Sequence, residues 1–153
     1  MPTFRTGNMW DVYPTADLFV ITTNSFITRD HRLVMGRGIA REACARFPGL
    51  ETRLAEAVAR RCGHLREYNL VIDRKTRIAA FQVKYHWADM ATPRLIRASA
   101  IALHNLVGER PLHVHMNFPG IGNGRLDRAD VLPLLMDLPE TVTIWERSKY
   151  SNN

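Results

Sequence analysis

Apolar residues along this chain fall into short β-branched runs that alternate with stretches of helical spacing. Residues 18–24, LFVITTN, form a continuous apolar run that predicts a buried strand. Residues 36–47 carry apolar side chains at helical spacing, and the following Pro48 and Gly49 predict the end of that helix. Residues 50–62 repeat the helical pattern on one face, which predicts a second helix.

The middle of the chain predicts a hairpin followed by a long helix. Residues 69–73 and 76–83 are two strand-like runs separated by a short polar turn, as in a β-hairpin. Thr92 is the expected N-cap of a helix that runs to about Val107, with Gly108 just past its end.

The last third continues this alternation. Residues 111–118 predict a strand that leads into the glycine-rich loop 119–127. A short helix follows, and its Pro133 is tolerable only in the first turn, which makes Asp130 the expected N-cap. Residues 141–146 predict the final strand. The alternation of strands and helices predicts an α/β architecture in which helices cover a mixed sheet.

At 153 residues, with 46% hydrophobic and 24% charged residues, the sequence predicts one globular domain over residues 1–153. It holds no apolar run of the ~20 residues that cross a membrane, and its N-terminus lacks a signal-peptide pattern. The two cysteines, Cys44 and Cys62, are too few for a disulfide framework or a zinc site. We therefore expect a cytoplasmic protein without a membrane partner, and nothing in the sequence requires more than a monomer.

The net charge of the chain points to anionic partners. Lysine and arginine number 21 against 15 aspartate and glutamate residues, which gives a formal net charge of +6. Such an excess favours a phosphate-bearing ligand or a nucleic acid. An enzyme that is simply basic would show the same composition, so charge alone leaves both interpretations open.

Two glycine-bearing loops, Met35–Ala40 and Pro119–Gly124, follow apolar strands and lead towards helices. Glycines allow tight turns that bring backbone N–H donors close to a phosphate, and a helix N-terminus adds partial positive charge. Two such loops at the carboxyl ends of strands suit the two phosphates of a diphosphate. The alternative for each loop is a structural turn, and neither has the spacing of a Rossmann or P-loop motif.

Four segments stand in a recognisable order along the chain: Asn24, Met35–Ala40, Phe81–Trp87 and Pro119–Arg128. This order resembles the macrodomain family, in particular the branch of glycohydrolases that remove terminal ADP-ribose from proteins or ADP-ribose from thymidine in DNA. The resemblance extends from Gly7 to Glu146, nearly the whole chain. It implies a single macrodomain, a three-layer α/β/α sandwich with a mixed central sheet, which binds ADP-ribose without a cofactor or a metal ion.

The resemblance also implies which residues hold the ligand. The two glycine loops would hold the diphosphate and the distal ribose, and Asn24 would face that ribose or, alternatively, only form a turn at the strand end. The expected ADP-ribose ligands are Asn8, Met9, Asn24, Met35, Gly36, Arg37, Gly38, Ile39, Ala40, Pro119, Gly120, Ile121, Gly122, Asn123, Gly124, Arg125 and Leu126.

Lys84 follows the apolar run IAAFQV and matches the catalytic lysine of the resembling glycohydrolases, which acts at the anomeric carbon. A lysine nucleophile must lose its proton, so its pKa must be lowered by burial or by a cationic neighbour, for which Arg37 and His86 are the candidates. Asp127 matches the acidic partner that acts as general acid or base. The alternatives are a strand-end lysine that reaches water and an aspartate that caps a helix.

The sequence departs from the family pattern at three places. Asn8 stands where many macrodomains have an aspartate that accepts from the adenine amine, and its amide oxygen keeps an acceptor without the charge. Residues 27–32, ITRDHR, form an insert that is a lid, a contact for a macromolecular substrate or a solvated loop. Arg125 follows the last glycine of the second loop where relatives have leucine, which shifts the place expected for Asp127.

Two further pairs of side chains admit a functional interpretation. His113 and His115 alternate along a predicted strand as a metal pair would, but no third ligand accompanies them, so structural histidines are expected. Trp87 and Trp145 are expected to be partly buried, with stacking on a base or a ribose as the alternative.

These observations favour an ADP-ribosyl glycohydrolase that releases ADP-ribose from a modified macromolecule, either single-stranded DNA or an acidic side chain of a protein. The presence of both Lys84 and Asp127 favours an enzyme, because a module that only binds ADP-ribose needs neither. The alternatives are such a non-catalytic binding module and a phosphatase that acts on ADP-ribose 1''-phosphate.

Overall fold

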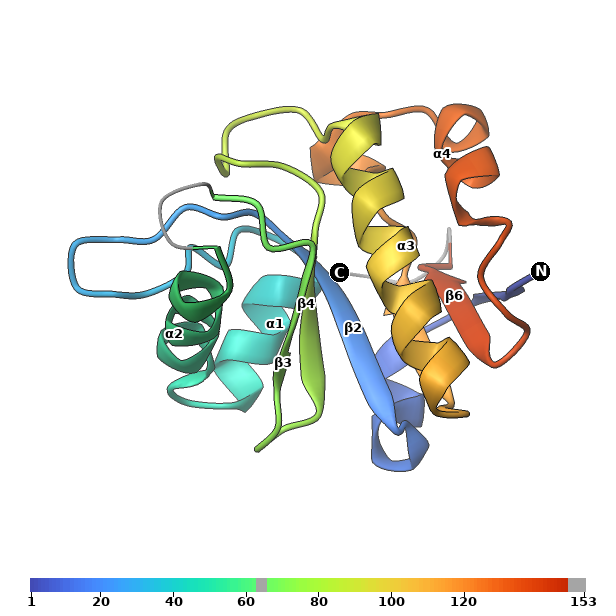
Figure 1. Ribbon diagram of the computed structural model, residues 1–153, viewed down its shortest axis with the longest axis horizontal. Coiled ribbons are helices and arrows are strands. Elements are labelled where there is room, and N and C mark those ends of the chain that lie inside the picture. Colours follow the sequence, from blue (N-terminus) through green and yellow to red (C-terminus); the bar gives the residue numbers. More distant parts are fainter. Residues whose placement is uncertain (63–65, 149–153) are drawn as a thin grey trace.

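The computed structural model describes residues 1–62 and 66–148, which build a six-stranded sheet (Figure 1). The strands are β1 (Thr3–Thr6), β2 (Leu18–Thr23), β3 (Leu70–Asp73), β4 (Ile78–Gln82), β5 (Val114–Asn117) and β6 (Val142–Glu146). Their spatial order is β1-β6-β5-β2-β4-β3. Every neighbouring pair is parallel except the antiparallel hairpin of β3 and β4, so the predicted mixed sheet is confirmed.

Helices cover both faces of this sheet. The α-helices are α1 (Ile39–Arg46), α2 (Leu50–Cys62), α3 (Pro93–Glu109) and α4 (Arg128–Leu135), and the 3-10 helices are η1 (Met9–Thr15) and η2 (Gly122–Gly124). In Figure 1, α1 and α2 lie on one side of the sheet and α3 and α4 on the other, which confirms the three-layer α/β/α sandwich. Among the helices that the structure describes, none is long and apolar enough to cross a membrane.

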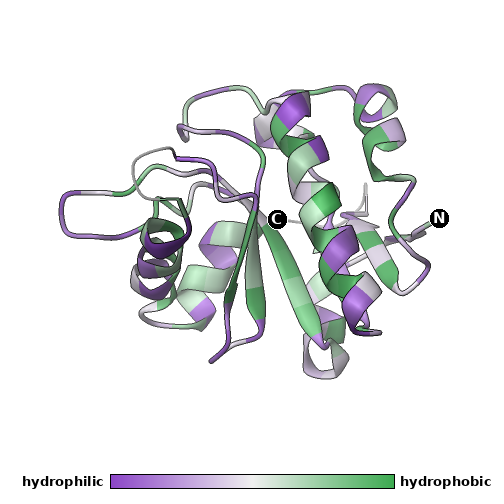
Figure 2. Cartoon of the chain, in the orientation of Figure 1, coloured by the Kyte–Doolittle hydropathy of each residue, from purple (hydrophilic) through white to green (hydrophobic). Residues whose placement is uncertain are grey.

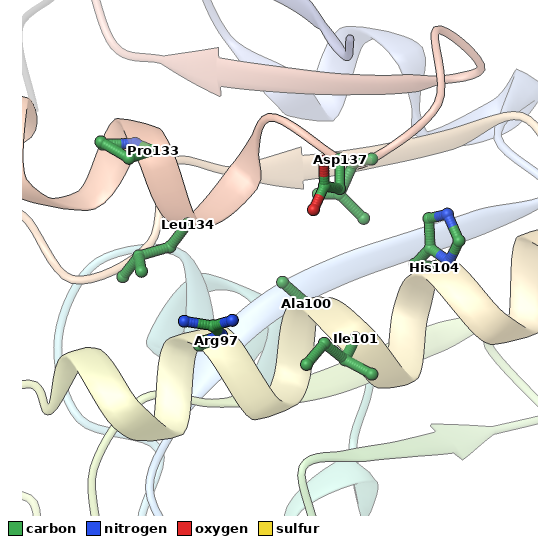
Figure 3. Close-up of a pocket in the computed structure, with 8 residues that line it drawn as sticks. Arg97, Ala100, Ile101, His104, Pro133, Leu134 and Asp137 are labelled. Atoms are coloured by element: carbon green, nitrogen blue, oxygen red, sulfur yellow. The ribbon is translucent and has the colours of Figure 1, made fainter.

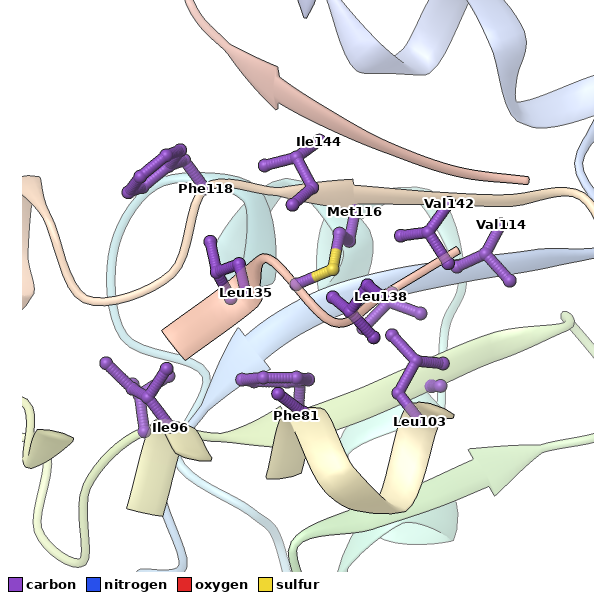
Figure 4. Close-up of a cluster of buried hydrophobic side chains, with 14 of the residues drawn as sticks. Phe81, Ile96, Leu103, Val114, Met116, Phe118, Leu135, Leu138, Val142 and Ile144 are labelled. Carbon is purple, nitrogen blue, oxygen red and sulfur yellow. The ribbon is translucent and has the colours of Figure 1, made fainter. Parts of the chain in front are cut away.

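Successive side chains of each strand point to opposite faces of the sheet, and one hydrophobic core lies on each face. In β2, Leu18 and Val20 pack towards α3 and α4, whereas Phe19 and Ile21 pack towards α1 and α2, and all four are buried. Figure 4 shows the first of these cores, in which side chains of α3, α4 and the strands meet. Figure 2 shows the complementary pattern, with hydrophobic strands in the interior and a hydrophilic outer side on α2. Burial on both faces explains why the β2 segment reads as one continuous apolar run.

Two helix boundaries differ from the sequence prediction because of glycine. The first predicted helix begins at Ile39 rather than at residue 36, because Gly38 precedes it with a φ of 67°, outside helical geometry. The third helix continues through Gly108 to Glu109, because this glycine keeps a helical backbone instead of ending the helix.

The last predicted helix begins earlier than expected. Asp127, and not Asp130, stands at the N-cap of α4, so Pro133 lies inside the helix rather than in its first turn. The proline removes one backbone donor from a helix of eight residues, which the short length tolerates. The strand predicted over residues 111–118 is shorter as well and covers Val114–Asn117.

The sequence patterns did not reveal β1 and η1. Three of the four residues of β1 are exposed, so this edge strand lacks the apolar run that marks the inner strands. Its place is fixed by parallel pairing with β6, which begins with Thr3 opposite Thr143. The first and last strands of the chain therefore lie side by side.

Candidate functional site

A cleft of about 980 Å³ opens at the carboxyl ends of the parallel strands. Residues that follow β1, β2, β4 and β5 line it together with the end of β6, because parallel strands bring their carboxyl ends to one edge of a sheet. This volume lies at the upper end of the range for small-molecule sites in proteins and suits a ligand of dinucleotide size.

Most of the residues that the sequence singled out meet in this cleft. Those that line it are Asn8, Met9, Asn24, Gly36, Arg37, Gly38, Ile39, Ala40, Lys84, Gly120, Ile121, Gly122, Asn123, Gly124 and Arg125. Met35, Pro119, Leu126 and Asp127 do not belong to the lining. The two glycine loops therefore face one shared space, although not every predicted residue reaches it.

Asn24 fixes the first loop to the end of β2. Its Nδ2 donates to the Val34 carbonyl at 2.9 Å, and its Oδ1 accepts the Phe26 N–H at 2.9 Å. Asn24 is 3% exposed, so both bonds form in a buried setting. A Cβ added at Gly36 or Gly38 would meet no protein atom within 4 Å. The glycines of the first loop thus keep the cleft open and are not needed for packing.

The second loop is packed at both ends and open in the middle. A Cβ added at Gly120 would lie 2.6 Å from Cδ1 of Ile96, and one at Gly124 would lie 2.9 Å from Cβ of Ala91. At Gly122, where φ is 68°, an added Cβ would meet nothing within 4 Å. Gly120 and Gly124 therefore allow close packing against the start of α3, whereas Gly122 presents its backbone to the cleft.

The Lys84 side chain is half-buried just beyond the end of β4. Its Nζ donates to the carbonyls of Trp87 at 3.1 Å and Asp89 at 3.2 Å. Burial and the positive charge of Arg125 lower the pKa of this amine, and the nearby Asp89 carboxylate opposes that effect. The cationic neighbour is therefore Arg125, and not Arg37 or His86 as the sequence suggested.

A buried glutamine, which the sequence patterns did not single out, holds the backbone of Lys84. Gln82 is fully buried, and its Nε2 donates to the carbonyls of Arg66 at 2.8 Å and Lys84 at 3.4 Å. Its Oε1 accepts the N–H groups of Tyr68 at 2.9 Å and Asn69 at 3.3 Å. All four bonding positions of the amide are used, which explains a polar residue inside an apolar strand.

Asp127 and Asn8 both stand at helix N-termini. Asp127 is exposed and caps α4 without a side-chain hydrogen bond to the helix. Asn8 caps η1 through its Oδ1, which accepts the Trp10 N–H at 3.1 Å, and it also lines the cleft. The structure thus brings Lys84 into the cleft wall without the acidic partner that the sequence paired with it.

No protein-family model and no curated protein matches the chain, but solved structures do. The macrodomain of Mycobacterium tuberculosis DarG is 26% identical, with a TM-score of 0.76 over 97% of this chain and 99% of that one. The macrodomain of Thermus aquaticus DarG is 22% identical, with a TM-score of 0.75 over 97% and 98% of the two chains. The chain has the macrodomain fold. A third structure, Thermosipho africanus DarTG in complex with ADP-ribose, has a TM-score of 0.77 at 17% identity. It aligns with 99% of this chain and with 43% of its own chain.

The cleft carries an excess of basic side chains. Its charged lining residues are Arg37, Arg41, Lys84, Arg125, Glu146 and Arg147. The one carboxylate among them, Glu146, is bound by Arg128 at 2.7 Å, and Arg147 is paired with Glu42. Arg37, Arg41 and Arg125 form no ion pair within the part of the chain that the structure describes. An anionic ligand would therefore meet basic side chains that no carboxylate neutralises.

The insert over residues 27–32 forms a small hairpin that projects from the fold. Ile27 and Leu33 pair as an isolated antiparallel bridge, and the Thr28 N–H donates to the Arg32 carbonyl at 2.8 Å. Figure 1 shows this loop extending to the far left, away from the sheet. None of the residues 27–32 lines the cleft, so the insert does not cover it as a lid would.

The two tryptophans of interest differ in exposure. Trp145 is 9% exposed and donates its indole N–H to Nδ1 of His115 at 3.0 Å. Trp87 is 51% exposed and lines the cleft, so the expectation of a partly buried side chain is wrong for it. His115 is engaged by Trp145, and among residues 1–62 and 66–148 no group of three metal-ligating side chains comes together.

A second, smaller hollow lies between α3 and α4, away from the strand ends (Figure 3). Its volume is about 390 Å³, and Ala100, Ile101 and Leu134 contribute apolar surface to it. Arg97, His104 and Asp137 line it as well, two on α3 and one beyond α4. This hollow contains none of the residues that the sequence assigned to chemistry.

Proposed function

We propose that this macrodomain binds ADP-ribose and hydrolyses the bond that joins it to a modified macromolecule. One observation carries the proposal: the amine of Lys84 is half-buried, has a lowered pKa and lies in the wall of a cleft formed by two glycine loops. The proposal is also supported by the ADP-ribose bound to the Thermosipho relative and by the resemblance to ADP-ribosyl glycohydrolases.

The two glycine loops are the proposed diphosphate site. Gly36 and Gly122 leave room for a ligand beside the backbone, and α1 begins directly after the first loop with its positive helix end. Arg37 adds positive charge at the same loop. Asn24 uses one amide hydrogen within the protein, so its second N–H is available to the distal ribose.

In the proposed reaction the neutral amine of Lys84 attacks the anomeric carbon of the distal ribose. The glycosidic bond breaks, its electron pair leaves with the aglycone, and the aglycone takes up the proton that the amine releases. Water then displaces the lysine from the ribose, which frees ADP-ribose and regenerates the amine. The lowered pKa of Lys84 increases the fraction of neutral amine available for the first step.

A substrate panel separates this function from its two alternatives. ADP-ribosylated single-stranded DNA, ADP-ribosylated protein and ADP-ribose 1''-phosphate are each incubated with the enzyme, and free ADP-ribose is titrated by calorimetry. We expect release of ADP-ribose from a modified macromolecule. Release of inorganic phosphate alone would indicate the phosphatase, and binding without turnover of any substrate would indicate the non-catalytic module.

Replacement of Lys84 tests the mechanism. Lys84→Ala is expected to lower kcat by at least about 10³-fold, because the proposed nucleophile is lost. The affinity for ADP-ribose should change little, because backbone donors of the loops hold the diphosphate. Lys75→Ala, in the exposed turn between β3 and β4, is the matched control and should behave as wild type. Turnover by Lys84→Ala at a rate near wild type would contradict the mechanism.

The catalytic role expected for Asp127 stays a prediction that a conservative variant tests. Asp127→Asn removes the acid but keeps a residue that suits a helix N-cap. Because this side chain does not line the cleft, we expect a smaller loss of kcat than in Lys84→Ala. An equally large loss, with unchanged thermal stability, would show that the carboxylate acts directly in the reaction.

Modified single-stranded DNA is the substrate that the charges favour over a protein. The net charge is +6, and the cleft is lined by basic side chains. Affinity for ADP-ribosylated DNA should therefore fall steeply between about 50 and 200 mM salt, because bound phosphates release counterions. Fluorescence anisotropy with a labelled oligonucleotide measures this dependence. Affinity that stays flat over this range would favour an acidic side chain of a protein instead.

We also infer that the macrodomain acts as a cytoplasmic monomer without a cofactor. Support comes from the composition of the sequence, which has few cysteines and no long apolar run. Light scattering of the purified protein, with and without ADP-ribose, tests the oligomeric state, and a stable dimer would contradict it.

A further inference from the structure

Three successive backbone carbonyls next to the cleft bind two basic side chains. Lys84 Nζ donates to the carbonyls of Trp87 at 3.1 Å and Asp89 at 3.2 Å. Between them, the carbonyl of Ala88 accepts from the Arg125 guanidinium at 3.1 Å. The loop Trp87–Asp89 therefore connects Lys84, at the end of β4, to Arg125, at the end of the second glycine loop.

Arg125 stands where the backbone favours a different residue. Its φ is 60° and its ψ is 18°, the left-handed conformation that glycine and asparagine adopt most readily. Its N–H donates to the Gly122 carbonyl at 3.0 Å, which closes the turn of η2. The backbone conformation therefore does not explain why an arginine stands here, as it also does not at Arg66 and Arg77.

The Arg125 side chain is also placed to act by its charge. It lines the cleft and has no ion-pair partner among the residues that the structure describes. In the part of the chain that the structure describes, the charges that act on Lys84 are those of Arg125 and Asp89. The Asp89 carboxylate accepts the His86 N–H at 3.2 Å, and the His86 ring accepts the Ala88 N–H at 3.0 Å, so both groups lie on the loop that follows Lys84. Arg125 is thus the cation that a second element brings towards the amine.

We propose that Arg125 is a positioning residue that acts on Lys84 in two ways, by holding the Trp87–Asp89 loop and by its positive charge. This inference rests on the proposed function, in which Lys84 must react as a neutral amine. The guanidinium fixes the carbonyl between the two that bind the amine, so the geometry around Lys84 depends on it. Its charge also disfavours the protonated amine, which agrees with the lowered pKa of Lys84.

Direct titration of Lys84 tests the proposal without any assay of activity. The chain has three lysines, Lys75, Lys84 and Lys149, so selective ¹³Cε labelling gives few NMR signals, and Lys84→Arg identifies the one of interest. In Arg125→Met, which keeps a long side chain but loses the charge, Lys84 should titrate at a higher pH than in wild type. An unchanged titration midpoint would overturn the proposal.

A matched variant at Arg66 separates the effect of the Arg125 side chain from the effect of its backbone conformation. Arg66 has the same φ of 60°, is exposed and does not line the cleft. Arg125→Gly and Arg66→Gly should both keep or raise the thermal midpoint, because glycine adopts this φ without strain. Only Arg125→Gly should raise the titration midpoint of Lys84. An equal effect of both variants on the titration midpoint of Lys84, or no effect of either, would overturn the proposal.

The pH dependence of turnover distinguishes the failure of this inference from that of the proposed function. In Arg125→Met, kcat should be lower than wild type at neutral pH and should recover towards wild type at alkaline pH. A loss that is the same at every pH would overturn the role of the charge. The proposed function fails instead if Lys84→Ala turns over substrate, whatever the result for Arg125.

Discussion

The two glycine loops of the cleft occupy equivalent places after strands of one sheet, yet they use glycine for different reasons. In the first loop, an added Cβ at Gly36 would meet no protein atom within 4 Å. In the second, an added Cβ at Gly120 would lie 2.6 Å from the fully buried Ile96. The glycines of the first loop therefore leave open space beside the backbone, where the proposed ligand would lie, whereas the second loop is shaped at its ends by packing against α3. A glycine-rich sequence alone does not tell these two uses apart.

Substitution at Gly120 should produce the largest effect and should act on folding. Gly120→Val is expected to destabilise the protein by about 3 kcal/mol, because it combines a φ of 80° with overpacking of the core. Urea unfolding followed by circular dichroism measures the change. Gly108→Val, on the exposed end of α3 where nothing lies within 4 Å, is the control and should not be destabilised. A Gly120→Val protein as stable as wild type would contradict the statement that the second loop, unlike the first, needs glycine for packing.

Substitution at Gly36 should act on the ligand and leave stability unchanged. Its φ is not positive and its Cβ position is open, so valine causes neither backbone strain nor a clash. The new side chain enters the cleft, and the affinity for ADP-ribose should fall by about 100-fold, or about 2.7 kcal/mol. Calorimetry and a thermal melt of the same sample test both statements, again with Gly108→Val as control. Unchanged affinity would contradict the assignment of the first loop.

Gly122 should fall between these two cases. An added methyl group meets no protein atom, but the φ of 68° makes any side chain unfavourable. Gly122→Ala should therefore cost about 1 kcal/mol of stability and about tenfold in ADP-ribose affinity. A stability loss without any change in affinity would place Gly122 with Gly120 as a packing residue.

The sequence predicted well those elements whose own residues show the apolar pattern of a buried strand or of a helix with one buried face. Strand β2 is buried on both faces and α2 has one apolar face, so each shows its own pattern in the sequence. By contrast, β1 exists because it pairs with β6 at the far end of the chain, and its own residues are largely exposed. No local pattern encodes such a strand, and the family resemblance, which begins at Gly7, does not reach it either.

The residues of the candidate site also divide into those that local sequence could predict and those that it could not. The glycine loops and Lys84 could be predicted because residue type and strand-end position mark them. The role of Gln82 could not be predicted, because its four hydrogen bonds reach segments that only the fold brings together. The Arg125 charge next to Lys84 was missed for the same reason, since 40 intervening residues separate the two. One signal was available for Gln82: a glutamine in an otherwise apolar strand requires buried partners.

The pairing of the first strand with the last has a consequence for how the protein is made. The Gly7 N–H donates to the Glu146 carbonyl at 2.8 Å, and both residues line the cleft. During synthesis the N-terminal strand must wait for residues 142–146 before this edge of the sheet closes, and such distant contacts slow folding. One wall of the cleft forms at that same step. The cleft of a nascent chain is therefore complete only when β6 has emerged from the ribosome.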